Sequence, residues 1–165
     1  MPTLETLIEL MKPWAKFYSK SHAAQTVVIF THVAGMLGGG GLAIAADRAM
    51  WKARTAAGDV RARLLSEVDR THRPVLIGLA LVVVSGLLMA AADIETFGPS
   101  PIFWGKMAAF VLLLANGAWL QSIERGMQHS PVGADAAWAK ITTSSRISYA
   151  LWFAVALGGV MLKNA

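Results

Sequence analysis

The sequence predicts an all-α fold, an integral membrane four-helix bundle with an N-terminal amphipathic interfacial helix. Three observations predict this fold. Hydrophobic residues make up 55% of the 165 residues and charged residues only 15%, which is too apolar for an ordinary soluble domain. Four apolar segments have about the length that a helix needs to cross a bilayer, roughly 17–25 residues. The charges collect in the short segments between them, as in the loops of membrane proteins.

The N-terminal segment 1–20 is expected to be a helix lying in the membrane interface. Its apolar residues recur at helical spacing, with charged residues between them. They are Leu4, Leu7, Ile8, Leu10, Met11 and Trp14. The helix should end near Pro13 or continue past a kink at that residue. A mobile tail is the alternative.

The four apolar segments are expected to be transmembrane helices, because lipid leaves no other way to satisfy the backbone hydrogen bonds. The spans cover about 23–46, 74–92, 102–121 and 145–162. The segment of about 57–68, between the first two spans, is also expected to be helical, with Asp59 as a cap. The chain is accordingly expected to be a single membrane domain over 1–165.

The distribution of basic residues predicts the orientation. Ten of them follow the first or the third span: Arg48, Lys52, Arg54, Arg61, Arg63, Arg70, Arg73, Arg125, Lys140 and Arg146. The remaining five, Lys12, Lys16, Lys20, Lys106 and Lys163, lie on the other side. Because basic loops stay in the cytoplasm, we expect a multi-pass protein of the bacterial inner (cytoplasmic) membrane with both termini outside.

His32 is the strongest candidate for a functional residue. It lies in the stretch FTHVAGMLGGGG, about 12 Å below the outer end of the first span at 1.5 Å per residue. It is the one ionisable side chain well inside a span, and such residues are costly to bury and often functional. A neutral histidine that only pins helix packing through a hydrogen bond is the alternative.

The residues around His32 predict a polar or small stripe that faces the bundle interior. The stripe contains Gln25, His32, Met36, Gly39 and Ala43, with Gly35 and Gly40 at its margins. The glycines remove side-chain bulk, which lets another helix approach closely. They would equally admit a flat cofactor such as a porphyrin, with His32 as the axial ligand. The spacing does not choose between these two explanations.

Two polar residues of the third span complete the candidates. Lys106 enters the membrane near its outer end, either snorkelling to the interface beside Trp104 or pairing with an anionic group such as a haem propionate. Asn116 lies in the middle of the same span and is expected to form an interhelical hydrogen bond.

Copper is a second possible cofactor. Thioether and imidazole groups suit Cu(I), and Met89, Met107 and Met161 lie near outer helix ends, with Met36 one turn below His32. Methionine is also a routine filler of apolar interiors. The chain has no cysteine, which excludes disulfides and thiolate metal sites. No nucleic-acid motif accompanies the basic loops, and no hydrolase triad or phosphate loop is present.

Three segments resemble two related groups of four-helix bacterial membrane proteins. They are THVAGMLGGGGLAIAADR in the first span, PVLIGLALVVVSGLLM in the second and FWGKMAAFVLLLANGAWL in the third. The groups are the membrane domain of the copper-resistance D family and the J-type protoporphyrinogen oxidase family. The oxidase resemblance implies haem b on His32 and a role for Lys106 in activity. LANGAWL departs from that family, where a further histidine is common. The copper resemblance implies passage of copper across the inner membrane.

Three functions follow as hypotheses. The first is a redox or electron-transfer protein that binds b-type haem, with His32 as the metal ligand and with Gly35, Met36, Gly39 and Lys106 in the cofactor site. The second is a non-catalytic membrane subunit that packs through the glycine seam, as a homo-oligomer or within a larger membrane complex. The third is a copper-handling permease. All three have membrane lipids as partners, and whether the protein is an enzyme stays open.

Overall fold

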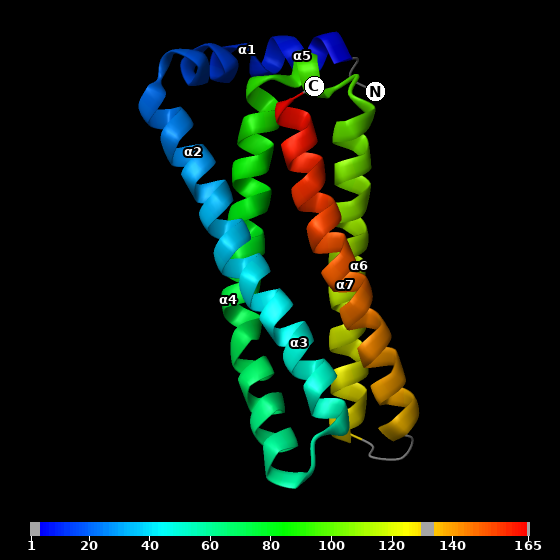
Figure 1. Ribbon diagram of the computed structural model, residues 1–165. Coiled ribbons are helices and arrows are strands. Elements are labelled where there is room, and N and C mark those ends of the chain that lie inside the picture. Colours follow the sequence, from blue (N-terminus) through cyan, green and yellow to red (C-terminus); the bar gives the residue numbers. More distant parts are fainter. Residues whose placement is uncertain (1–3, 130–133, 165) are drawn as a thin grey trace.

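The computed structural model describes residues 4–129 and 134–164, and these residues form helices and turns without a strand (Figure 1). The all-α prediction is confirmed. The elements are α1 (Leu4–Lys20), α2 (His22–Gly35), the π-helical turn η1 (Met36–Gly40), α3 (Gly41–Thr55), α4 (Gly58–Ala92), α5 (Ile94–Phe97), α6 (Pro101–His129) and α7 (Ala134–Lys163). Helices α2, η1 and α3 follow one another directly and form one long helix.

Four helices in the described residues are long and apolar enough to cross a membrane. They contain the four predicted spans and are mostly longer than them. The first, His22–Thr55, has 34 residues, or about 51 Å at 1.5 Å per residue, against a bilayer core of about 30 Å. The second, Gly58–Ala92, continues through Pro74. The prediction that the segment 57–68 is helical is confirmed from Gly58 onward, and this segment is the first part of α4.

The long helices run between two ends of the molecule (Figure 1). Helix α1 lies across one end, together with the short α5 and both chain termini, and we call this the α1 end. The α2–η1–α3 helix leads away from it, α4 returns, α6 leads away again and α7 returns. Close backbone contacts join α2, η1 and α3 to α4, α3 to α7, and α6 to α7. The bundle is therefore two helical hairpins that meet through α3 and α7.

Helix α1 is attached to the bundle by side chains near its C-terminal half. It continues past Pro13 to Lys20 without a break. The Trp14 indole Nε1 donates to the carbonyl oxygen of Leu88 at 2.8 Å. The Gln25 amide donates to the carbonyl oxygen of Tyr18 at 2.9 Å, which satisfies one of the free carbonyls at the end of α1. These bonds fix how α1 lies over the bundle.

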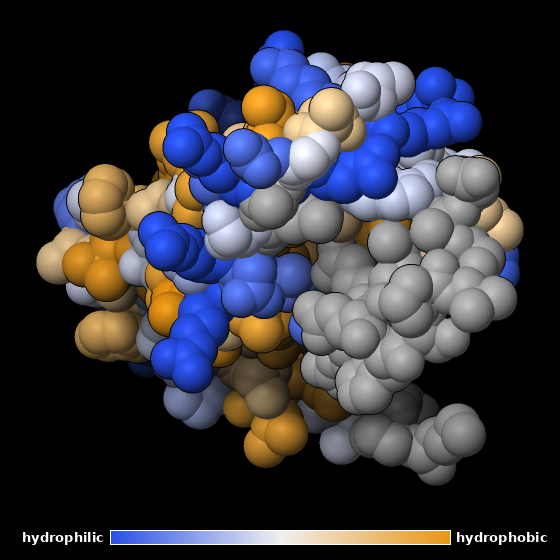
Figure 2. Space-filling view, turned by 90° about the horizontal axis from the view of Figure 1, so that it is seen from below, coloured by the Kyte–Doolittle hydropathy of each residue, from blue (hydrophilic) through white to orange (hydrophobic). Residues whose placement is uncertain are grey.

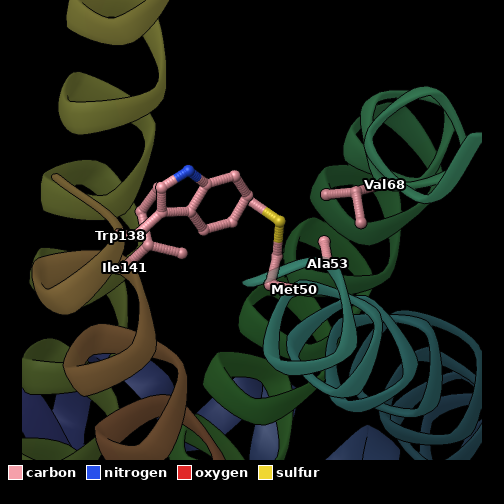
Figure 3. Close-up of a cluster of buried hydrophobic side chains, with 5 residues drawn as sticks. All are labelled: Met50, Ala53, Val68, Trp138 and Ile141. Carbon is pink, nitrogen blue, oxygen red and sulfur yellow. The ribbon is translucent and has the colours of Figure 1, made fainter. Parts of the chain in front are cut away.

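A hydrophobic cluster joins three helices toward the opposite end (Figure 3). Its buried members are Met50 and Ala53 of α3, Val68 of α4, and Trp138 and Ile141 of α7. The Met50 thioether points toward the Trp138 indole, a favourable sulfur–aromatic arrangement. The view onto this end shows hydrophilic residues gathered around it (Figure 2). The parts of α3, α4 and α7 that lie outside the predicted spans therefore pack around an apolar core of their own.

The predicted interhelical hydrogen bond of Asn116 is confirmed. Its amide nitrogen donates to the Ser144 carbonyl oxygen at 3.0 Å, and its amide oxygen accepts from the Ser144 hydroxyl at 3.1 Å. Both residues are buried, Asn116 at 8% exposed and Ser144 at 0%. This reciprocal pair fixes the register between α6 and α7, because a shift of either helix would leave buried polar groups without partners.

One stability prediction concerns Arg61 of α4, which closes the first hairpin at the end opposite the α1 end. Its guanidinium donates to the carbonyl oxygens of Ala53 and Arg54, both at 3.0 Å, and lies 5.2 Å from the centre of the Trp138 ring. Charged hydrogen bonds at a helix C-terminus and a cation–π contact predict a loss of roughly 1–3 kcal/mol in Arg61→Ala. Unfolding in mixed micelles of a mild detergent with increasing SDS measures it. Arg63→Ala, at an exposed arginine nearby, is the control and should leave stability within about 0.5 kcal/mol.

Candidate cofactor site

His32 lies on α2, ten residues after its first residue His22 and therefore about 15 Å along the helix from the α1 end. The imidazole is half-buried and points to α4. Its Nδ1 is hydrogen-bonded to the Ser85 hydroxyl oxygen at 3.0 Å. Gly86 leaves room for the ring, since a methyl group at that position would lie 3.3 Å from Cε1. The neighbouring helix thus orients the histidine.

Lys106 comes from the other hairpin and is also half-buried. Its stem lies across α7, where a methyl group at Gly158 would be 3.1 Å from the lysine Cβ. A methyl group at Gly159 would be 3.5 Å from Nζ. The side chain therefore runs along the neighbouring helix, while the adjacent Trp104 is 60% exposed. In the part of the chain that the structure describes, its ammonium has no hydrogen bond or ion pair.

The two predicted site residues lie in the half of the bundle near the α1 end, His32 on α2 and Lys106 on α6. His32 and its neighbour Ser85 come from the first hairpin, and Lys106 and its glycines from the second. Each of the four long helices thus contributes residues around one of these two side chains. An imidazole nitrogen and a cation in the same half of a bundle suit a ligand with a metal and a carboxylate.

Ser85, Gly86, Gly158 and Gly159 were missed by sequence reasoning. The Ser-Gly pair at 85–86 and the Gly-Gly pair at 158–159 are the weak signals that the sequence contains. Glycine and serine inside an apolar run mark close approach of a neighbouring group. They do not say which group approaches, because this depends on the register between helices.

Gly35 and Gly39, predicted as cofactor-binding residues, pack against α4 instead. A methyl group at Gly39 would lie 2.9 Å from the Gly78 Cα, and one at Gly35 would lie 2.8 Å from the Gly78 carbonyl oxygen. The space that these glycines leave is therefore filled by the backbone of α4. Of the two explanations for the glycines, the structure favours close helix packing for this pair.

The π-helical turn η1 separates the faces of the first long helix. Gly39 contacts α4, whereas a methyl group at the next residue, Gly40, would lie 2.9 Å from the Trp152 ring of α7. A π-helical turn inserts one extra residue and so rotates the face that follows it. The polar or small stripe around His32 was predicted with one constant rotation per residue. In the structure this stripe is therefore divided between two neighbouring helices, α4 and α7. Gly38 and Gly41 have open space around them.

Met36, the remaining predicted site residue, lines a shallow apolar groove between η1, α3 and α7. The groove has a volume of about 190 Å³, and Leu37, Gly41, Trp152 and Phe153 are among its lining residues. Most sites that enclose a drug-sized ligand measure about 300–1,000 Å³. The groove does not include His32, although Met36 follows His32 by one turn and its backbone N–H donates to the His32 carbonyl oxygen.

The structure brings no second histidine to His32. His72 lies on α4, 14 residues before Gly86, the residue next to the His32 ring. This separation is about 21 Å along the helix, as the sequence predicted for a residue at the other end of the bundle. Among the described residues, no group of three or more His, Cys, Asp or Glu side chains is placed to hold a metal ion.

No protein-family model, no curated protein and no solved structure matches this chain. The resemblance to the two four-helix groups therefore stays an expectation from the sequence.

Proposed function

We propose that this chain is a small four-span membrane protein that binds one b-type haem through His32 and serves in redox or electron transfer. The observation that carries the proposal is the half-buried His32 imidazole, which is hydrogen-bonded to Ser85 of the neighbouring helix at 3.0 Å, in a segment that would lie inside a membrane. An ionisable side chain in such a place is expensive to bury and is expected to have a ligand-binding role. Lys106 is a second half-buried ionisable side chain in the same half of the bundle.

The donor chemistry of the site fits a haem. A single imidazole suffices as an axial ligand of b-type haem, so the absence of a larger ligand group in the described residues is compatible with it. The positive charge of Lys106 favours a propionate carboxylate, since the described residues provide no acidic partner for it. When bound, the haem would supply one-electron chemistry at its iron. His32 would hold the iron, and Lys106 would orient the group through its carboxylate.

The proposed location is the bacterial inner membrane with the α1 end outside. The ten basic residues that follow the first and third spans favour the opposite end as the cytoplasmic one. Hydrophilic residues gather around that end (Figure 2). Helix α1 would then lie in the outer interface, with exposed apolar residues such as Leu10 and Phe17 in contact with lipid. The site would be in the outer half of the membrane.

An absorption spectrum tests the proposal. The protein is purified in mild detergent from cells supplied with haem, and spectra are recorded oxidised and dithionite-reduced. A Soret band with sharp reduced α and β bands is the expected result. A featureless spectrum would contradict haem binding, and the same sample would then be analysed for copper.

The role of Lys106 gives a separate prediction. Lys106→Gln removes the charge but keeps most of the stem, and it should weaken haem binding roughly tenfold, because a hydrogen bond to a charged group contributes about 1.5–3 kcal/mol. Haem titration of the haem-free protein measures the dissociation constant. Lys140→Gln, at an exposed lysine of α7, is the control and should have no effect. Equal affinities of wild type and Lys106→Gln would remove the lysine from the site.

A non-catalytic membrane subunit is the second candidate function, and the structure changes which surface such a subunit would use to bind a partner. The seam formed by Gly35 and Gly39 is filled by α4 of the same chain, so these glycines do not require another subunit. A homo-oligomer or larger complex would have to use a different surface. A copper-handling permease is the third candidate, and no observation in the described residues favours it over haem.

A further inference from the structure

The hydrogen bond between His32 and Ser85 determines which nitrogen of the histidine can bind a metal. Ser85 is 1% exposed, so its hydroxyl has no access to bulk water. Three groups surround it: the carbonyl oxygens of Leu81 and Val82 on its own helix and Nδ1 of His32 on α2. The Nδ1 contact is 3.0 Å and the Val82 contact 3.3 Å.

The position of the hydroxyl proton follows from these neighbours. A serine hydroxyl has one proton and two acceptor lone pairs, whereas a carbonyl oxygen only accepts. The Ser85 and Leu81 oxygens are in hydrogen-bonding contact, and two oxygens this close repel each other unless a proton lies between them. The Ser85 proton is therefore donated to the carbonyl of Leu81, and the oxygen presents a lone pair to His32.

The protonation of the imidazole follows in turn. Because Ser85 Oγ can only accept from His32, Nδ1 must carry a proton and donate it. A neutral imidazole has one N–H group, so Nε2 is then unprotonated and has a free lone pair.

We propose that Ser85 is a positioning residue that holds His32 in the Nδ1–H tautomer and so presents Nε2 as the metal-binding nitrogen. The identity of the metal as haem iron rests on the proposed function, but the tautomer does not. In known metal sites a ligating histidine typically donates its other ring N–H to an acceptor, which fixes the ring and makes the ligand more basic. Ser85 supplies that acceptor here, and Gly86 leaves the space for the ring beside it.

The ¹⁵N NMR spectrum of the haem-free protein tests the tautomer directly. The full chain is labelled with ring-¹⁵N histidine in micelles, at a pH where the histidines are neutral, and the His32 signals are identified by their loss in His32→Ala. The chemical shifts and two-bond couplings to ring protons distinguish Nδ1–H from Nε2–H. We expect Nδ1–H in the wild type. An Nε2–H ring in the wild type would overturn the proposal, even if no variant folds.

Variants of Ser85 then separate positioning from a purely structural role. Ser85→Ala should shift His32 toward a mixture of tautomers or to Nε2–H, and Ser85→Thr, which keeps the hydroxyl, should restore Nδ1–H. Ser145→Ala is the matched control, since Ser145 is a 0% exposed serine on α7, and it should leave the His32 signals unchanged. An unaltered tautomer in a folded Ser85→Ala protein would show that Ser85 does not determine it.

The haem-loaded protein provides the second measurement. Loss of the Nδ1–H acceptor makes the imidazole a weaker donor, so Ser85→Ala should raise the midpoint potential and weaken haem retention roughly 10–100-fold, as for other supporting residues of metal ligands. The NMR measurement of the tautomer and the measurement of haem binding test different proposals. An Nδ1–H wild type that binds no haem would contradict the proposed function alone, whereas a haem protein with Nε2–H before loading would contradict the role of Ser85 alone.

Discussion

His32→Ala is expected to abolish haem retention while the four long helices remain folded. The side chain is half-buried and is hydrogen-bonded to Ser85. Its removal therefore costs little packing but deletes the imidazole nitrogen that would bind iron. Retention is measured as the ratio of Soret to protein absorbance after purification and as haem affinity in a titration of the haem-free protein. Circular dichroism and size-exclusion chromatography report whether the fold persists.

His22→Ala is the matched control for this variant. His22 begins the same helix, is exposed and lies ten residues before His32. It should keep the full haem content. Equal haem content in His32→Ala and the wild type would remove His32 from the site and with it the proposed function. A loss of haem in both variants would point instead to a general effect on α2.

Gly39→Leu is expected to cause the largest loss of stability among single substitutions in the first long helix. Even a methyl group there would lie 2.9 Å from the Gly78 Cα and 3.2 Å from the Val75 carbonyl oxygen. These are backbone atoms, which cannot move aside as a side chain does, so η1 and α4 would have to separate. Overpacking typically costs 1–3 kcal/mol, and we expect about 3 kcal/mol or more here.

Gly38→Leu provides a control inside the same π-helical turn. Gly38 is the neighbouring residue, it is exposed, and nothing lies within 4 Å of a methyl group placed there. Both variants replace glycine by the same residue, so the effects of helix propensity and hydrophobicity are shared. Unfolding in SDS mixed micelles should therefore show a large loss for Gly39→Leu and little change for Gly38→Leu. Similar stabilities for the two would show that the seam with α4 is not as close as described.

Most of the fold could be predicted from the sequence, because a membrane restricts the possible structures so strongly. Apolar segments of sufficient length must be helices in lipid, and all four predicted spans lie within helices of the structure. The predicted interhelical hydrogen bond of Asn116 was confirmed for a similar reason, since a polar amide in an apolar span needs a hydrogen-bond partner in another helix. Helix ends were less predictable, as α4 shows. The first half of α4 is polar and the second half is apolar, so the sequence suggested two helical segments. The helix nevertheless continues through Pro74 without ending.

The candidate site could be predicted only in part. His32 and Lys106 were found because ionisable side chains stand out in apolar surroundings. The roles of Gly35 and Gly39 could not be decided, because a glycine shows only that space is needed and not what fills it. Gly78 fills it here. Ser85 gave little signal, since one hydroxyl in an apolar span is common, and its importance depends on its distance from Nδ1 of His32.

The sequence by itself determined that four apolar helices form, which residues in them are costly to bury and where the basic loops lie. These properties depend on the transfer of side chains between water and lipid, and each residue contributes to them almost independently of the others. Only the tertiary structure decided that Gly39 faces Gly78, that Gly40 faces Trp152 and that Ser85 is hydrogen-bonded to His32. Those contacts depend on the register between helices and on one extra residue in a π-helical turn. A shift of a single residue would send each of these side chains to a different neighbour.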